Sequence, residues 1–213
     1  GEAKGEVEVK PGTPAVSVDK EILKDLAGEV SQGQTVTVKL TVETKEDPAD
    51  KAELESVITG DKEKVLYLDL SLLKQVNDAE PEAITNAVRV LEIAVDYDFT
   101  GKKDVTVYRK HGDAKAEVLT KLAARPAKDF KDGTFFADGE NGVVYIYASK
   151  FSTYAIAYTA QEEEPTPTPT RRPTRRPSRE EEPTVTLPFV DVASTDPFFD
   201  AVRYVYENKL MVG

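Results

Sequence analysis

The chain has 213 residues, a net charge of −11 and no cysteine. This length allows one or two domains, and a hydrophobic content of 39% allows a packed core beneath a heavily charged surface. The negative charge disfavours nucleic acids and anionic membranes as partners, and the lack of a run of about 18 apolar residues argues against membrane insertion. Because the chain opens with Gly1-Glu-Ala-Lys and not with Met, we expect a processed or excised piece of a longer protein.

Residues 1–160 have the sequence pattern of one β-rich domain. Apolar and polar side chains alternate along several segments, which is typical of strands with one buried face. The alternation runs through Val36–Val42, Leu66–Leu72, Leu91–Tyr97 and Val105–Val107, and β-forming residues return in Gly142–Ala148 and Thr153–Tyr158. This spacing predicts a mainly β fold, an Ig-like antiparallel β-sandwich.

Two short helices are expected to interrupt these strands. The first runs from Asp19 to Gly28, with Asp19 as the N-cap and Gly28 as the stop signal. The second runs from Pro48 to Gly60 and follows Asp47. Both place apolar side chains along one stripe, so both should pack against the sheets.

The segment Asp138-Gly-Glu140-Asn141-Gly142 joins two apolar runs and predicts a β-hairpin. Its residue types would also suit a calcium site, but the Asp-x-Asp-x-Asp-Gly spacing of a calcium loop is missing, so we favour the turn. One histidine and no cysteine make a zinc site improbable. We therefore predict no metal and no cofactor.

Catalytic residues are not apparent in this sequence. His111 is the single histidine and lies in the polar turn 109–113, where we expect an exposed loop residue. The carboxylates Asp69, Asp96 and Asp98 occupy the polar positions of alternating strands, which predicts solvated strand faces. The prediction is a protein that is not an enzyme.

Tyrosines gather in the last two predicted strands, at Tyr145, Tyr147, Tyr154 and Tyr158. If these strands pair, one sheet face would carry a row of aromatic rings. Tyr145, Tyr147 and Tyr154 would then be candidate glycan contacts. The alternative is cross-strand packing, which aromatic residues of hairpins commonly provide.

Residues 161–186 have the composition of a linker. They contain almost no apolar side chains and cannot bury a core, and their Thr-Pro repeats favour a disordered or extended polyproline II spacer. Arginines between positions 171 and 179 form a basic cluster, but glutamates flank it at 162–164 and 180–182. Because these glutamates neutralise the arginines locally, we favour a spacer over a nucleic-acid site.

Residues 187–213 contain a spaced motif around one expected amphipathic helix, which Pro197 would begin. The motif comprises Phe189, Asp191, Val192, Phe199, Ala201, Val202, Val205 and Gly213. It resembles the opening half of an S-layer homology (SLH) module, the unit that attaches many Gram-positive surface proteins to the cell wall. The family's second half, with a Thr-Arg-Ala-Glu-like polymer-binding motif, is not seen in this sequence. The resemblance implies a secondary cell-wall polymer as the partner of a complete SLH region.

A second resemblance covers roughly residues 15–160. The segments Leu91–His111 and Tyr145–Tyr158 are similar to a β-sandwich domain of exported proteins from Gram-positive (Firmicutes-type) anaerobes. In such proteins the domain often precedes a Pro/Thr linker and a wall-attachment element, and the same order occurs here. The resemblance implies a stalk or display domain without a known activity.

Together these observations predict three parts: a surface domain at 1–160, a linker at 161–186 and an SLH-like motif at 187–213. The leading hypothesis is a non-catalytic structural and display module that is extracellular and associated with the cell wall. One alternative is an adhesin or carbohydrate-binding β-sandwich. A second alternative is self-association into a surface filament, in which Gly5–Val9 or Thr184–Pro188 adds to a neighbour's sheet edge.

Overall fold

The computed structural model describes residues 1–161, apart from the side chain of Lys64, and Tyr204. The chain separates into two units, Gly1–Thr166 and Pro167–Gly213, and the elements bounded below belong to the first. In the second unit, Tyr204 is helical and 63% exposed. The predicted linker beyond Gln161 and the rest of the SLH-like motif lie outside the described residues.

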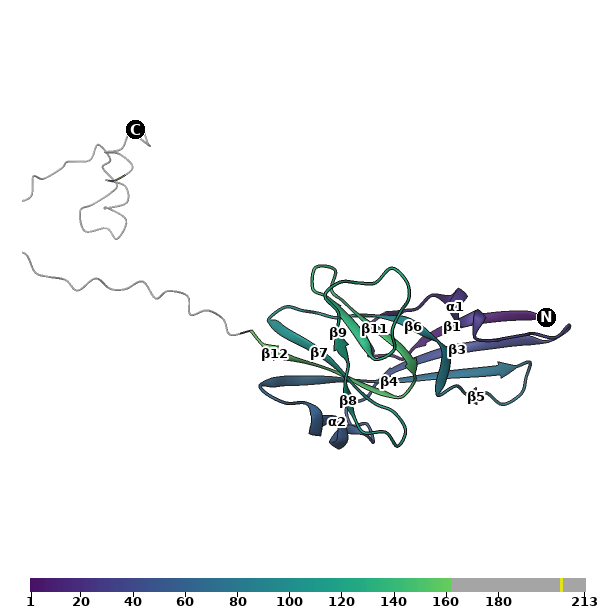
Figure 1. The fold of residues 1–213 in the computed structure, drawn as a ribbon, viewed down its shortest axis with the longest axis horizontal. Coiled ribbons are helices and arrows are strands. Elements are labelled where there is room, and N and C mark those ends of the chain that lie inside the picture. The colour runs from purple at the N-terminus through teal and green to yellow at the C-terminus, as the bar shows by residue number, and fades with distance from the viewer. Residues whose placement is uncertain (162–203, 205–213) are drawn as a thin grey trace, which may run out of the picture. The chain divides into compact units, whose positions relative to one another are not determined.

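Within residues 1–161 the chain forms two β-sheets and two short helices, which confirms the mainly β prediction (Figure 1). The larger sheet has seven strands, in the order β1-β3-β4-β12-β7-β8 with β5 paired to β4. These are β1 (Glu2–Val9), β3 (Thr35–Thr44), β4 (Lys62–Val76), β5 (Glu82–Ala83), β7 (Lys102–Lys110), β8 (Glu117–Val118) and β12 (Thr153–Ala160). The smaller sheet has five strands, in the order β2-β6-β11-β10-β9. These are β2 (Val16–Ser17), β6 (Asn86–Asp96), β9 (Thr120–Lys121), β10 (Thr134–Asp138) and β11 (Val143–Lys150).

One hydrophobic core lies between the two sheets and is built from the predicted alternation. The larger sheet contributes every second residue of β3, β4, β7 and β12, and the smaller sheet does the same from β6 and β11. Fully buried members include Val38, Leu40, Val42, Leu68, Leu91, Ile93, Val95, Val107, Val144, Ile146 and Ile156. Each such side chain stabilises the fold by about 1.5–3 kcal/mol relative to exposure.

The prediction of an antiparallel sandwich is wrong for two strand pairs. Strand β1 runs parallel to β3, from Glu2 opposite Thr35 to Val9 opposite Val42, and β9 runs parallel to β10. After β1 the chain crosses to the smaller sheet as β2, forms a helix, and only then returns as β3. Parallel neighbours need such a crossover connection, and a hairpin cannot supply one.

Helix α1 (Lys20–Asp25) lies against β1 and contributes to the main core (Figure 1). Asp19 is its N-cap as predicted, because its carboxylate accepts a hydrogen bond of 2.9 Å from the Glu21 amide. The helix is shorter than predicted and ends with Leu26 as the C-cap. Leu23 is fully buried in the main core, so the helix is held by packing.

Helix α2 (Lys51–Val57) covers part of the outer face of the larger sheet, near β7 and β8 (Figure 1). Leu54 is fully buried there and packs with Tyr67, Tyr108, Ala155 and Ala157, which form a second, smaller core. The helix is shorter than the predicted 48–60, and its N-cap side chain makes no capping hydrogen bond. Burial of one leucine is therefore its main anchor.

Gly5 allows α1 to approach β1 closely. A Cβ atom at this position would overlap the carbonyl oxygen of Lys20 and lie 2.9 Å from Cβ of Leu23. The carbonyl belongs to the helix backbone, which cannot move without displacing the buried Leu23.

We predict that Gly5→Ala lowers the free energy of unfolding by roughly 1–3 kcal/mol, the usual cost of overpacking. Urea denaturation measures this loss. Gly139→Ala is the control, because its new Cβ would meet its nearest neighbour, the Phe99 ring, at an ordinary 3.9 Å. Equal stability of the Gly5→Ala variant and the wild type would contradict the close approach.

Candidate functional site

The three tyrosines predicted as glycan contacts do not share one sheet face. Strand β11 belongs to the smaller sheet and β12 to the larger one, so the last two strands do not pair. Tyr145 and Tyr147 lie on the face of β11 opposite the core residues Val144 and Ile146, whereas Tyr154 is part of the main core. The condition for a row of tyrosines on one sheet face, pairing of the last two strands, is therefore not met.

Side chains cover the outer face of β11. The Tyr147 ring is fully buried, lies 5.0 Å from the Phe130 ring between centroids, and its hydroxyl donates to Glu92 at 3.0 Å. The Tyr145 ring is 9% exposed, with the Arg125 guanidinium 4.1 Å from its centroid. Tyr147 and Tyr154 have no exposed surface for a sugar, so the observed contacts favour packing over glycan binding at these residues.

Arg125 fastens the segment between β9 and β10 over this outer face. Its guanidinium donates to both oxygens of Glu92, at 2.6 and 3.0 Å, in a bidentate pair. The hydrogen bond with Glu92 raises the pKa of Arg125, so the guanidinium stays charged at neutral pH. Burial raises the pKa of Tyr147, and its bond to Glu92 adds to the effect, which leaves the phenol neutral.

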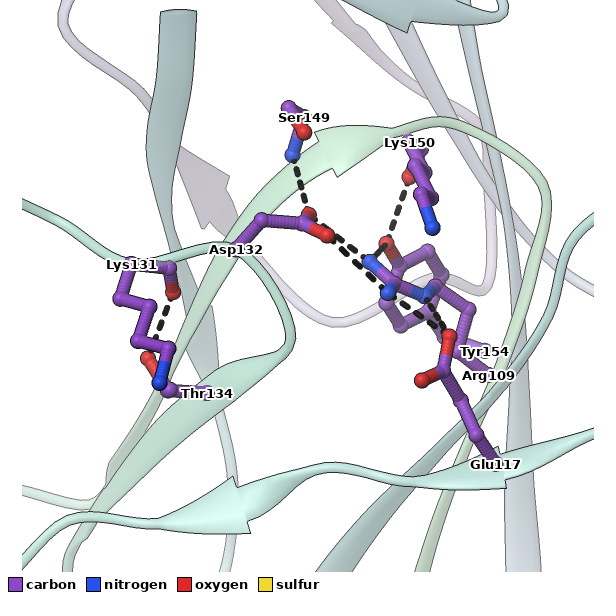
Figure 2. A network of polar contacts seen from close by, with 8 residues as sticks. All are labelled: Arg109, Glu117, Lys131, Asp132, Thr134, Ser149, Lys150 and Tyr154. Atoms are coloured by element: carbon purple, nitrogen blue, oxygen red, sulfur yellow. Dashed lines mark hydrogen bonds and ion pairs between the residues drawn. The ribbon is translucent and has the colours of Figure 1, made fainter.

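Arg109 forms the most deeply buried polar network in the described part of the chain (Figure 2). It projects from β7 into the space between the sheets and is 2% exposed. Its guanidinium donates to both oxygens of Asp132 at 2.8 and 3.1 Å, to Glu117 at 2.8 and 3.0 Å, and to the Tyr154 hydroxyl at 3.5 Å. All five of its N–H donors can therefore be satisfied.

Asp132 connects this network to the smaller sheet. It precedes β10 and also accepts a hydrogen bond of 2.8 Å from the backbone amide of Ser149 on β11 (Figure 2). Burial alone would raise the pKa of Asp132, but the hydrogen bonds from Arg109 and Ser149 hold it below the ordinary value of 3.8. Burial raises the pKa of Tyr154 to about 12. The network is a closed structural clamp between the two sheets.

His111 is half-buried, not the exposed loop residue that was predicted. Its Nδ1 atom is buried and has no hydrogen-bond partner within the described residues. The neighbouring Lys110 is 4% exposed, donates to the Gly112 carbonyl, and pairs with Glu53 at 3.4 Å.

The segment Asp138–Gly142 forms the predicted hairpin turn between β10 and β11. Asp138 accepts hydrogen bonds from the backbone and side-chain nitrogens of Asn141, at 3.1 and 2.8 Å. These bonds hold the Asp138 pKa below its ordinary value. Across residues 1–161 and Tyr204, no three His, Cys, Asp or Glu side chains are grouped closely enough to hold a metal ion.

Three hollows meet around the C-terminal end of β6. Two of about 380 Å³ share Asp96, and a third of about 540 Å³ shares Tyr97 and Asp98 with one of them. Asp96 and Asp98 are exposed, in agreement with their prediction as solvated positions. The strands predicted from the sequence did not indicate a hollow here. The run Asp-Tyr-Asp-Phe at 96–99 showed only that aromatic and acidic residues are neighbours in the chain.

Lys102 organises the aromatic residues of this region. Its ammonium lies 4.7 Å from the centroid of the Tyr97 ring and 5.1 Å from that of Tyr158, and it donates to the Asp98 carbonyl at 2.6 Å. The Tyr97 and Phe99 rings meet edge to face at 5.1 Å. Burial raises the pKa of Tyr97 to about 12. In this region, aromatic rings that are held in place line open hollows. It is the candidate binding site of the described unit.

Comparison of the chain with known protein families, curated proteins and solved structures found no match. Among the described residues, no helix combines the length and apolar character that crossing a membrane requires.

Asp132 makes stability depend on pH in a defined direction. Its pKa in the folded protein lies below 3.8, so its contribution is complete above that pH and is lost as the pH falls through the lowered pKa. We predict that Asp132→Asn lowers the free energy of unfolding at neutral pH by on the order of 1–3 kcal/mol.

The same variant should show a weaker loss of stability on acidification than the wild type, as measured by urea denaturation between about pH 7 and about pH 2. Asp113→Asn, which removes an exposed carboxylate from the turn after β7, is the control. Parallel pH profiles for Asp132→Asn and the wild type would show that the Asp132 carboxylate is not linked to folding.

Proposed function

We propose that this chain is a non-catalytic structural and display module of a Gram-positive cell-surface protein, attached to the wall through an SLH region. The order of its parts carries the proposal. Strand β12 ends at Ala160, directly before the Pro/Thr/Arg-rich sequence that leads to the SLH-like motif at 187–213. The folded unit is followed by a segment with the composition of a linker, and then by the SLH-like motif.

The use of polar residues in the sandwich supports a structural role. Arg109 and Arg125 are both committed to bidentate ion pairs, with Asp132 and Glu92 respectively. Such pairs hold segments in place. A sandwich followed by a Pro-rich spacer suits a domain that is held away from a surface.

The proposed partner is a secondary cell-wall polymer, which a complete SLH region would bind. The proposed location is extracellular and wall-associated. The net charge of −11 is compatible with this setting, because it keeps a crowded surface protein apart from its neighbours. The sandwich itself needs no ligand for this function.

Co-sedimentation with purified Gram-positive sacculi tests the proposal. We predict that the 213-residue chain stays in the supernatant, because its SLH-like motif shows only the opening half of the module. The chain fused after Gly213 to a complete SLH region should pellet, and removal of the secondary polymer from the sacculi should abolish pelleting. Pelleting of the unfused chain with stripped sacculi would instead assign wall binding to the sandwich.

A second candidate function is assembly by strand addition, and the edge position of β1 favours it. Glu2 and Lys10 donate their amides to Gln34 and Val42, so the even-numbered residues of β1 face β3. The amides and carbonyls of Ala3, Gly5, Val7 and Val9 then point to the free edge, where no strand of the described residues pairs.

Strand addition predicts a mass that rises with protein concentration in light scattering. Val7→Pro should lower this self-association, because it removes one free-edge amide and leaves the bonds to β3 intact. A monomer mass at every concentration would exclude assembly through this edge.

A further inference from the structure

The β6-end groove is defined here as the two adjoining hollows that share Tyr97 and Asp98, with volumes of about 380 and 540 Å³. Elements far apart in sequence form it: the end of β6, the start of β7, the end of β12 and the β10–β11 turn. Both volumes fall in the range of small-ligand sites, roughly 300–1,000 Å³. The groove belongs entirely to the described sandwich.

Aromatic rings contribute to the apolar lining of the groove, together with Pro14, Val65 and Leu66. Tyr97 lines both hollows, with Tyr158 lining one and Phe99 lining the other. Tyr158 and Phe99 are both half-buried residues, so neither is sealed within the core. Lys102 fixes the two tyrosines by lying within 5.1 Å of both ring centroids, so the rings are positioned before any ligand arrives.

The charge of the groove restricts its ligand. Asp96, Asp98 and Glu140 line it, and among residues 1–161 Lys102 is the single cation that does so. The Lys102 ammonium contacts two rings and donates to the Asp98 carbonyl, and three carboxylates outnumber it in the groove. An acidic ligand would meet uncompensated carboxylates, whereas hydroxyl or ammonium groups would find acceptors.

Backbone groups of the groove are largely committed to its own turns. The Thr100 amide donates to Asp98 at 2.9 Å, the Asn141 amide donates to Asp138 at 3.1 Å, and the Tyr97 amide donates to the Gly142 carbonyl at 2.8 Å. A peptide that binds by strand addition needs free main-chain partners at its site, and these three amides cannot serve it. The rings and carboxylates that line the groove suit the apolar faces and hydroxyl groups of a sugar.

We infer that the β6-end groove binds a saccharide chain built from neutral or amino sugars. The open parts of Phe99 and Tyr158 stack on the apolar faces of the sugar rings. Asp98 and Glu140 accept hydrogen bonds from hydroxyl or ammonium groups. This inference goes beyond the proposed function, which assigns the sandwich no ligand, and it places sugar binding away from Tyr145, Tyr147 and Tyr154.

Two-dimensional NMR titration of the full chain tests the inference with three tetrasaccharides and one peptide. The probes are an N-acetylglucosamine tetramer (neutral), a glucosamine tetramer (cationic), a galacturonic acid tetramer (anionic) and tetra-arginine. We expect the neutral and cationic sugars to shift amides of Tyr97–Lys102 and Glu140–Gly142 at millimolar concentration. The anionic sugar and the peptide should leave these amides unchanged.

Substitutions assign the binding to the groove. Phe99→Ala and Tyr158→Ala should each weaken sugar binding about tenfold, as expected for the loss of one stacked ring. Phe136→Ala is the matched control, because this half-buried aromatic residue stacks with Tyr145 and does not line the groove. Circular dichroism of each variant verifies that it is folded.

Glu140→Gln keeps the test valid if an aromatic variant fails to fold, because Glu140 is exposed in a turn. It should weaken binding of the cationic tetramer more than binding of the neutral one. The inference is overturned if neither the neutral nor the cationic sugar binds, if tetra-arginine alone binds, or if Phe99→Ala and Glu140→Gln bind as the wild type does.

Discussion

Arg109 is the charge on which the closure of the sandwich depends. Its side chain extends from β7 of the larger sheet and is 2% exposed. The guanidinium lies 2.8 Å from the carboxylate of Asp132, beside the smaller sheet. A buried guanidinium is costly unless every donor is satisfied, and here Asp132, Glu117 and Tyr154 complete the set. Loss of one partner would leave an uncompensated charge within the core. Because Asp132 lies beside the smaller sheet, the two sheets must stay close at this point for Arg109 to keep its partners.

The clamp also explains how neighbouring segments are placed. Asp132 accepts from the Ser149 amide at 2.8 Å, so the segment before β10 is bound to β11. That segment contains Arg125, whose pair with Glu92 covers Tyr145 and Tyr147. Fixing one end of the segment through Asp132 thus favours burial of the aromatic outer face. The open groove is left at the far end of β6, where hairpin and strand ends leave rings partly exposed.

Local patterns predicted the local structure well. Alternation at Val36–Val42 and Leu91–Tyr97 identified strands with the correct buried face, and Asp19 was identified as the α1 cap. The Asp138–Gly142 turn formed the expected hairpin. These features depend on side chains within a few residues of one another, which a single sequence displays directly.

Features set by distant contacts were not predicted. The parallel pairing of β1 with β3 depends on a crossover through the smaller sheet, which alternation does not encode. Tyr145 and Tyr154 fell on different sheets because the chain changes sheet between β11 and β12. Likewise, Arg109 finds partners 8, 23 and 45 residues away, so its sequence neighbourhood of polar residues suggested only an exposed turn.

A double-mutant cycle on Arg109→Met and Asp132→Asn tests the clamp most directly, with unfolding free energies from urea denaturation. We predict a coupling energy of about 2 kcal/mol, within the range for contacting residues. The pair tested by Arg125→Met and Glu92→Gln, whose arginine is half-exposed, should give a smaller coupling, about 0.2–1 kcal/mol. Additive effects of Arg109→Met and Asp132→Asn would contradict the account, because the two sheets would then be held together without this ion pair.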